Sequence, residues 1–298
     1  MARGGTAKME VEPGLRLVRA PNPSPMTHTG TNTWIVGQGE VAVIDPGPDL
    51  PAHLAAIEAA LGAGERIGHV LVTHAHRDHS PLARPLAARW GAPVLAAGGM
   101  AARRRPVMAR LAAEAGIGGG EGVDAGFAPD VVLEDGAEIA GEDWRLDVIA
   151  TPGHTADHLA FAWGEAVFTG DHVMGWASSL VSPPEGDVVP FMASCRRLAA
   201  RPSRVFYPGH GEPVDDPAGR LAWLVAHREA REAAIVAALG EGGPATPGAL
   251  AARIYTDTPP ALLPAAERNV LAHLIALVEA GRATASPAVS SRAHYTLA

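Results

Sequence analysis

The chain contains a single cysteine, Cys195, among its 298 residues. A lone cysteine excludes an internal disulfide framework and also excludes a metal site built from several thiolates. Any bound metal must therefore be held by histidine and carboxylate side chains. The scarcity of cysteine also fits a protein of a reducing compartment.

Basic residues are also fewer than acidic residues. The sequence has 24 Lys and Arg residues against 32 Asp and Glu residues, which gives a formal net charge of −8 and an isoelectric point near 5.9. A chain with this net negative charge is not expected to bind nucleic acids non-specifically, although it can still contain a local basic patch. Hydrophobic residues make up 47% of the chain, which is enough for a substantial core.

Targeting and membrane segments are not expected. Residues 1–10 mix Arg, Gly, Lys and Glu and lack the apolar run of a secretory signal. No stretch of the sequence approaches the length of a membrane-spanning helix. We therefore expect a cytoplasmic protein without a membrane partner.

One motif concentrates the residues that can bind metal. Residues 73–80 read Thr-His-Ala-His-Arg-Asp-His-Ser, with the potential ligands His74, His76, Asp78 and His79. Neutral imidazole and carboxylate are the usual ligands of zinc and of the metals that resemble it. The motif lies between a predicted strand at 67–73 and a predicted helix that ends at residue 90. Such connecting loops commonly carry catalytic groups on a rigid scaffold.

Three later segments repeat one pattern, in which a short apolar strand stops at a Gly next to His or Asp. They place His154 after a strand at 147–150, Asp171 after one at 166–168, and His210 after one at 204–207. Gly lets the backbone turn sharply, so that the neighbouring side chain projects at the strand end. A lone His in such a place is usually structural. The repetition, together with the first motif, favours a shared metal site.

The potential ligands suffice for two metal ions. His74 and His76 can point to one side of an extended segment, and His154 completes a set of three. Asp78, His79 and His210 can serve a second ion, and Asp171 can bridge the two. Two ions roughly 3.5–4 Å apart would share a water molecule, lower its pKa to about 7 and so provide a bridging hydroxide. The predicted reaction is hydrolysis at an acyl or phosphoryl centre, with zinc as the expected divalent metal and manganese or iron also suitable.

Three further residues have two interpretations each. Asp45 follows a predicted strand at 41–44, where it is either a turn residue or a carboxylate that orients a ligand histidine. His158 and His172 are candidate catalytic residues beside Asp78, as proton donors to the leaving group. The alternative for both histidines is a hydrogen-bonded structural role.

Two further segments have two interpretations each, and a third segment between them is expected to be flexible. The arginines at 103–105 and Arg110 form either a solvated face or a cationic rim for an anionic substrate. Residues 116–122 are rich in glycine and are expected to be flexible. Residues 178–187 follow Asp171 and either line the substrate pocket or form a plain loop.

The four motifs resemble the metallo-β-lactamase superfamily over about residues 12–220. The resemblance implies an α/β fold, the αββα sandwich, in which two β-sheets lie back to back with helices outside. With Asp78 present, the full ligand set resembles that of the branch that includes glyoxalase II, RNase Z and lactonases. It differs from the ligand set of typical zinc β-lactamases.

A narrower resemblance concerns both ends of the chain. Residues 22–33, the pair Asp157-His158 and the C-terminal segment are similar to the β-lactamase-like protein 2 group, whose members append a small, mainly α winged-helix-like domain. The resemblance implies a catalytic domain at 12–220 and a winged-helix-like domain at 221–285. Chain ends are often poorly ordered, so we expect a flexible N-terminus at 1–11 and a disordered tail at 286–298. In the winged-helix-like domain, helices are expected at 221–239, 246–254 and 264–281, followed by a short wing at 282–286.

The C-terminal domain is not basic. Residues 221–285 contain five Arg and six acidic residues, a net charge of −1. A winged helix that reads DNA is normally basic, so we favour a packing role or a homodimer formed through this domain.

Three functions are compatible with the sequence. The best-studied members of the group resemble single-strand-selective endoribonucleases, and this resemblance implies a phosphodiester substrate, RNA. The alternative is a small-molecule substrate, for a thioesterase of the hydroxyacylglutathione hydrolase type or a lactonase. However, residues 172–176 lack the Tyr and basic residues that hold glutathione in that family. A non-catalytic metal-binding or interaction module is the third interpretation, and the intact ligand set argues against it.

Overall fold

Two β-sheets form the centre of the molecule. The computed structural model describes residues 9–114, 117 and 122–298. The first sheet contains, in spatial order, β1 (Met9–Glu12), β2 (Leu15–Arg19), β3 (Asn32–Val36), β4 (Glu40–Ile44), β5 (Arg66–Leu71), β6 (Val94–Ala96) and β7 (Val131–Val132). The second contains β12 (Val205–Pro208), β11 (Ala166–Gly170), β10 (Leu159–Trp163), β9 (Arg145–Ala150) and β8 (Glu138–Ala140).

The two sheets pack face to face because successive side chains of a strand point to opposite sides. In β3, Trp34 and Val36 enter the core between the sheets, whereas Ile35 points to the opposite face. In β10, Phe161 enters the same central core and Ala160 points to the other side. This period of two is what an extended strand imposes on its side chains.

Helices cover the outer faces of both sheets. Next to the first sheet lie α1 (Pro51–Ala59) and α2 (Ala83–Trp90), which share the core cluster of Ile57, Val70 and Leu86. The second sheet is covered by α5 (Val188–Ala199), through Phe191 and Leu198. The short helices α3 (Met100–Arg103) and α4 (Pro106–Ala113) follow β6. The predicted αββα sandwich is confirmed.

The strands that precede the motifs end at one edge of the sandwich. β4 and β5 run parallel, so the residues that follow them, Asp45 and the 73–80 loop, lie together. β9 and β11 both pair antiparallel with β10, and β12 runs parallel to β11. The carboxyl ends of all five strands therefore meet, which is the usual place for a binding site in an open α/β arrangement.

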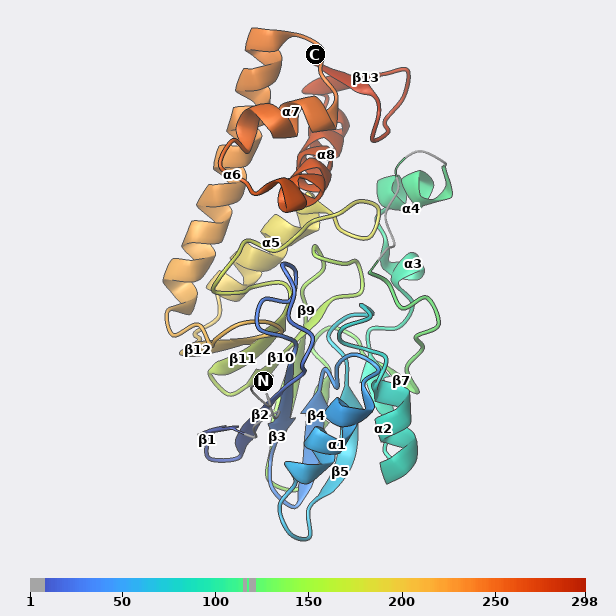
Figure 1. The fold of residues 1–298 in the computed structure, drawn as a ribbon, viewed down its shortest axis with the longest axis vertical. Helices are drawn as coiled ribbons and strands as arrows, with labels where there is room; N and C mark the ends of the chain where they lie inside the picture. The colour runs from blue at the N-terminus through green and yellow to red at the C-terminus, as the bar shows by residue number, and fades with distance from the viewer. Residues whose placement is uncertain (1–8, 115–116, 118–121) are drawn as a thin grey trace, which may run out of the picture.

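The C-terminal region forms a second unit at one end of the longest molecular axis (Figure 1). It contains α6 (Pro217–Gly242), α7 (Pro247–Ile254), the 3-10 helix η1 (Pro260–Leu262), α8 (Leu263–Glu279) and the hairpin of β13 (Ala283–Ser286) and β14 (His294–Leu297). These elements have a core of their own, which also takes in Met108 and Leu111 of α4. The predicted winged-helix-like domain is thus present as helices and a hairpin.

The long helix α6 belongs to both units. Leu221 and Leu224 near its start pack with Phe191 of α5 against the second sheet, whereas Ile235 and Leu239 near its end enter the C-terminal core. The boundary predicted at residue 221 therefore lies inside a continuous helix.

The prediction of a disordered tail after residue 286 is wrong. Residues His294–Leu297 form β14, which pairs antiparallel with β13. Tyr295 is fully buried, its backbone N–H and carbonyl bond to Ala245, and its hydroxyl donates to the Ser290 carbonyl at 2.9 Å. The last residues of the chain thus close the core of the C-terminal domain.

One helix also corrects the expectation about apolar stretches. Residues Pro260–Glu279, which include α8, are long and apolar enough to cross a membrane by length and composition, with a mean hydropathy of 1.4. Val270, Leu271 and Leu274 of α8 are buried in the C-terminal core. A core helix of a soluble protein passes the same test, so this feature is weak evidence for a membrane.

Candidate metal centre

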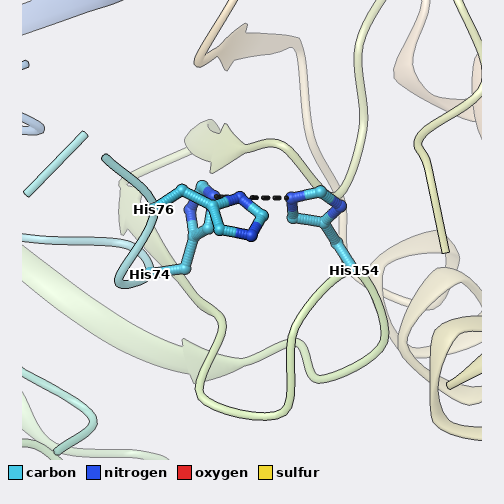
Figure 2. A group of neighbouring side chains, drawn as sticks. All are labelled: His74, His76 and His154. Atoms are coloured by element: carbon cyan, nitrogen blue, oxygen red, sulfur yellow. Dashed lines mark hydrogen bonds between the residues drawn. The ribbon is translucent and has the colours of Figure 1, made fainter. Parts of the chain in front are cut away.

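Three histidines from two loops converge at the edge of the sandwich. His76 Nδ1 lies 2.9 Å from His74 Nε2 and 3.1 Å from His154 Nε2. Figure 2 shows the three rings turned toward one another, with His74 and His76 on one loop and His154 on another. Two ligand atoms on a tetrahedral zinc ion with bonds of about 2.0–2.1 Å are separated by roughly 3.3 Å. The spacing of the three nitrogens therefore fits one metal ion.

A second group lies beside the first and carries negative charge. His210 Nε2 is 3.3 Å from His79 Nε2 and 3.1 Å from an oxygen of Asp78. Asp78 lies 3.5 Å from His79 Nε2. These atoms also lie close enough together to share one ion.

Asp171 stands between the two groups. Its carboxylate oxygens are 3.5 Å from His79 Nε2, 3.4 Å from His210 Nε2 and 3.8 Å from His154 Nε2. The Oδ1 atom is buried and has no hydrogen-bond partner among the described residues. A buried carboxylate oxygen without a donor fits a metal ligand, because a cation would compensate the cost of its burial.

Asp45 and Thr73 fix the orientation of two of these rings. Asp45 accepts hydrogen bonds from the Thr73 backbone N–H, from the Thr73 hydroxyl and from His79 Nδ1, at 2.8, 2.8 and 3.0 Å. Because its own proton goes to Asp45, the Thr73 hydroxyl oxygen accepts from His74 Nδ1 at 2.9 Å. The Nε2 lone pairs of His74 and His79 are thereby directed into the site. Of the two interpretations of Asp45, these contacts favour an orienting carboxylate.

Backbone carbonyl groups orient the imidazole rings of His154 and His210. His154 Nδ1 donates to the Leu180 carbonyl at 2.7 Å, and His210 Nδ1 donates to the Gly30 carbonyl at 3.1 Å. A carbonyl oxygen can only accept, so the tautomer of each imidazole is set. The side chain of Asn32 in turn holds the turn around His210 by donating to the Pro208 and Gly211 carbonyls.

One glycine is needed for the close approach of the loops. A Cβ atom on Gly209 would lie 2.5 Å from Asp171 Oδ1 and 2.7 Å from His79 Cε1. Any side chain at this position would push Asp171 and His79 apart. The Gly-His-Gly pattern of the sequence therefore has a steric reason.

The two groups differ in electrostatics. Burial and the neighbouring imidazoles of His79 and His76 hold the pKa of His74 well below its usual range, and burial and His154 lower the pKa of His76 to about 3. Burial also tends to lower the pKa of His79 and of His210, but the negative charges of the neighbouring carboxylates outweigh this effect. They raise the pKa of His79 well above its usual range and the pKa of His210 to about 9.

The carboxylates respond to the same charges. Burial disfavours the ionised form of Asp78 and Asp171, but the imidazoles of His79 and His210 lower the pKa of both carboxyl groups. Without a metal, the second group is therefore an array of ion pairs, whereas His74 and His76 are neutral.

His158 is buried below the site and does not line its cavity. Its Nδ1 lies 2.8 Å from the Thr151 hydroxyl, its Nε2 accepts from the Asp171 backbone N–H at 3.2 Å, and its ring stacks on His74. Burial, together with His172, keeps its pKa well below the usual range. An accepting Nε2 carries no proton to give, so this placement argues against the proton-donor interpretation.

His172 is also fully buried, on the side of α5. Its ring packs on Phe191, with 4.5 Å between the ring centroids, and its Nε2 lies 3.5 Å from Cys195 Sγ. Burial and the nearby His154 lower its pKa to about 3. Its surroundings favour the structural interpretation here too.

A cavity of about 360 Å³ opens over the metal-binding side chains. Its described lining consists of His76, Asp78, His154, Asp171 and His210 on one side and Met26, Gly122, Val123, Leu180, Ser182 and Glu185 on the others. Residues of the 178–187 segment thus do line the pocket, as one of the two sequence interpretations expected.

The arginine cluster does not form a free cationic rim. Arg103 pairs with Glu134, Arg104 with Glu185, and Arg105 with Asp187 and Glu279. These ion pairs hold α3 and the start of α4 to neighbouring segments. Of the glycine-rich segment expected to be flexible, 116 and 118–121 lie outside the described residues.

The main contributions that the sequence did not reveal come from backbone atoms. The carbonyl groups of Leu180 and Gly30 orient two histidines, and no residue type signals such a role. Asp157 is a partial exception, because it stands in a motif. It accepts from the Ala75 backbone N–H at 3.3 Å and supports the loop between His74 and His76.

Comparison with known families agrees with this geometry. Residues 26–210 match the Metallo-beta-lactamase superfamily, and residues 246–288 match the Beta-lactamase associated winged helix domain. The chain belongs to the metallo-beta-lactamase superfamily, whose members are metal-dependent hydrolases.

Curated relatives define its place in the superfamily more closely. It is similar to the Beta-lactamase-like protein 2 homolog of Caenorhabditis elegans, with 28% identity over 84% of this chain and 79% of the relative. The homolog of Drosophila melanogaster is 30% identical over 88% and 86%. The resemblance to the β-lactamase-like protein 2 group is thus confirmed.

Other similar proteins are a fungal relative and a solved structure. The chain spans only 64% of the Lactamase-like protein nscB of Trichophyton rubrum, at 31% identity over 77% of this chain. A metallo-beta-lactamase family protein from Thermus thermophilus has a TM-score of 0.77 and 28% identity, over 97% of this chain and 100% of that one.

Proposed function

We propose that the protein is a hydrolase with a dinuclear centre of divalent metal ions, zinc being the expected metal. Support comes from the division of the ligands into a neutral group of three imidazoles and an anionic group of Asp78, His79 and His210, with Asp171 between them. Two bound ions would supply Lewis acidity and a water molecule of lowered pKa.

The residues of the chain have separate tasks in this proposal. Asp78 and Asp171 provide the negative charge that two cations require, and the imidazoles complete the coordination. Asp45 and the carbonyl of Leu180 keep the ligands oriented, so that little reorganisation is needed when metal and substrate bind. Met26 and Leu180 contribute apolar surface to the cavity wall.

The composition of the cavity wall favours a neutral acyl substrate, such as an ester, a thioester or a lactone. No Lys or Arg belongs to the described lining of the cavity, and the Glu185 carboxylate in that lining is paired with Arg104. A phosphodiester chain is bound mainly through cations that neutralise its phosphates. This observation carries the choice between the two substrate classes, and the single-stranded RNA substrate stays a prediction without support from the pocket.

The experiment is a comparison of substrates with metal-loaded protein. We expect turnover of a thioester of N-acetylcysteamine or of a simple lactone, and little or no cleavage of a single-stranded oligoribonucleotide. S-lactoylglutathione tests the hydroxyacylglutathione alternative in the same assay. The Asp78→Ala variant separates the enzyme from contaminants, because it should lose activity on every true substrate.

Metal content is measured on the same samples. About two ions per chain are expected for the wild type, and one ion or none would contradict a dinuclear centre. Cleavage of RNA that depends on Asp78, without turnover of any acyl substrate, would overturn the choice of substrate. If no substrate is turned over although two ions are bound, the result would favour the interpretation as a non-catalytic metal-binding module.

A further inference from the structure

A second cavity, of about 190 Å³, lies between the catalytic domain and the C-terminal domain. Its walls come from three parts of the chain: the N-terminal loop around Met26, the segment at 174–180, and the stretch from Tyr255 to α8. Met26 and Leu180 line both this cavity and the one over the metal-binding residues. The two cavities are therefore adjacent, with two apolar side chains at their junction.

The chemistry of this second cavity is apolar. Its described lining includes Met26, Met174, Trp176, Leu180 and Leu262, and it contains no charged side chain. Met26 and Trp176 are 47% and 37% exposed, which is high for large hydrophobic residues. Unbranched thioether side chains adapt to the shape of an apolar ligand. A ligand that covered these residues would gain the free energy of removing their surface from water.

The position of the cavity relative to the metal centre is fixed by hydrogen bonds. The Leu180 carbonyl accepts from His154, and the next backbone N–H, of Val181, donates to the side-chain oxygen of Asn269 on α8 at 3.0 Å. Arg228 on α6 donates to the same oxygen at 2.8 Å. The short segment Leu180-Val181 thus forms part of the wall of the apolar cavity, accepts the hydrogen bond that orients His154, and is held in place by the C-terminal domain.

We propose that the second cavity binds the straight aliphatic acyl chain of a substrate whose carbonyl carbon lies at the metal centre. This proposal rests on the proposed acyl-hydrolase function and specifies its substrate class. A chain that starts at the metal centre passes between Met26 and Leu180 into a space with apolar walls. The C-terminal domain is then part of the substrate site, through Tyr255, Leu262 and Ala265.

The test uses N-acetylcysteamine thioesters with acyl chains from acetyl to decanoyl and follows thiol release. In the wild type, kcat/KM should rise by about fourfold for each methylene until the cavity is filled. The best chain should then exceed acetyl by at least about fiftyfold, as several methylenes are buried. A plug in the cavity, Ala265→Phe, should remove most of this preference.

The matched control is Ala261→Phe, the same change at an exposed position of η1 outside the cavity lining. It should keep the wild-type ratio of decanoyl to acetyl turnover. Turnover of the acetyl thioester without a rise in kcat/KM along the series would overturn the proposal. A rise that persists unchanged in Ala265→Phe would overturn it as well.

Binding of decanoate, measured by calorimetry, separates this proposal from the proposed function. If metal-loaded protein hydrolyses no thioester, the result contradicts the acyl-hydrolase function but not the apolar binding site. Decanoate that binds the wild type and Ala261→Phe at least about tenfold more tightly than Ala265→Phe would still support the apolar site. Equal affinity for the three proteins would overturn it.

Discussion

Arg228 of α6 donates a hydrogen bond from Nη1 to the side-chain oxygen of Asn269 on α8, at 2.8 Å. The guanidinium is buried, it lies over the ring of Phe191, and among the described residues no carboxylate forms an ion pair with it. Burial lowers the pKa of Arg228 to about 10. A buried cation that depends on neutral acceptors makes Asn269 important for the whole interface between the two domains.

Replacement of Asn269 is the first prediction. Asn269→Leu leaves Arg228 and the Val181 N–H without this acceptor, so the free energy of unfolding should fall by about 2–4 kcal/mol. Because Val181 adjoins the carbonyl that orients His154, zinc affinity should also fall, by about tenfold or more. Urea unfolding and competition with a chromophoric chelator measure the two effects.

Asn269→Asp is the matched control, since it keeps the acceptor and adds a charge that complements Arg228. It should retain wild-type zinc affinity and lose no stability. Equal zinc affinity in Asn269→Leu and Asn269→Asp would contradict the link between the C-terminal domain and the metal centre.

The second prediction concerns Asp45, which accepts hydrogen bonds from Thr73 and His79. Asp45→Asn replaces one acceptor oxygen by a donor and removes a negative charge next to His79. Metal affinity should drop by about 10–100-fold, with the ligands themselves intact. The exposed Asp49, changed to Asn, controls for loss of charge. If both variants bind zinc equally well, Asp45 is only a turn residue.

The third prediction is opposite pH dependence for metal-free and metal-loaded protein. In the metal-free state the carboxylates raise the pKa of His210 to about 9, above its unfolded value near about 6.5. The stability from this protonated pair is fully present below the unfolded pKa and is lost as the pH rises toward about 9. Urea unfolding of metal-free protein should therefore show falling stability between about pH 6.5 and 9.

Metal binding should behave in the reverse way, because ions must displace the protons held by His79 and His210. Affinity at the second group should increase over the same pH range. Calorimetry in buffers of different ionisation enthalpy should detect proton release for the second ion. For the first ion, His74 and His76 contribute no proton near neutral pH, since the pKa of both is lowered. Equal proton release for both ions would be incompatible with these pKa shifts.

The fourth prediction concerns the end of the chain. Tyr295 is fully buried in the C-terminal core, so Tyr295→Ala should cost about 3–5 kcal/mol of stability. Tyr295→Phe removes only the hydroxyl bond to Ser290 and should cost about 1 kcal/mol. Chemical denaturation measures both. No loss of stability in either variant would mean that the tail contributes nothing to the fold.

The candidate metal-binding residues could be recognised in the sequence because their signal is local. His74, His76, Asp78 and His79 share one short motif, and His154, Asp171 and His210 each follow a strand next to a glycine. The fold followed from the resemblance that these motifs carry. Orientation of the ligands could not be predicted in the same way, because the carbonyl groups of Leu180 and Gly30 exist at every position of every sequence.

Burial determines the surroundings of the residues that the sequence could not place. His158 and His172 stand beside motif residues, but only tertiary packing shows that both rings face the interior. Tyr295 lies in a short polar segment, where the contact with Ala245 outweighs the weak local pattern. The helix α5 gave no clear signal either, although Asp187 caps it by accepting from the Val189 N–H at 3.0 Å.

The continuous helix α6 sets a limit on how this molecule can change in evolution. Its 26 residues join the packing against the second sheet to the core of the C-terminal domain without a break. Each residue of an α-helix advances the chain by about 100° around the axis. One inserted or deleted residue between Leu224 and Ile235 would swing the C-terminal domain around the catalytic domain and pull Asn269 away from Val181. Variation in α6 should therefore occur by substitution, with its length kept constant.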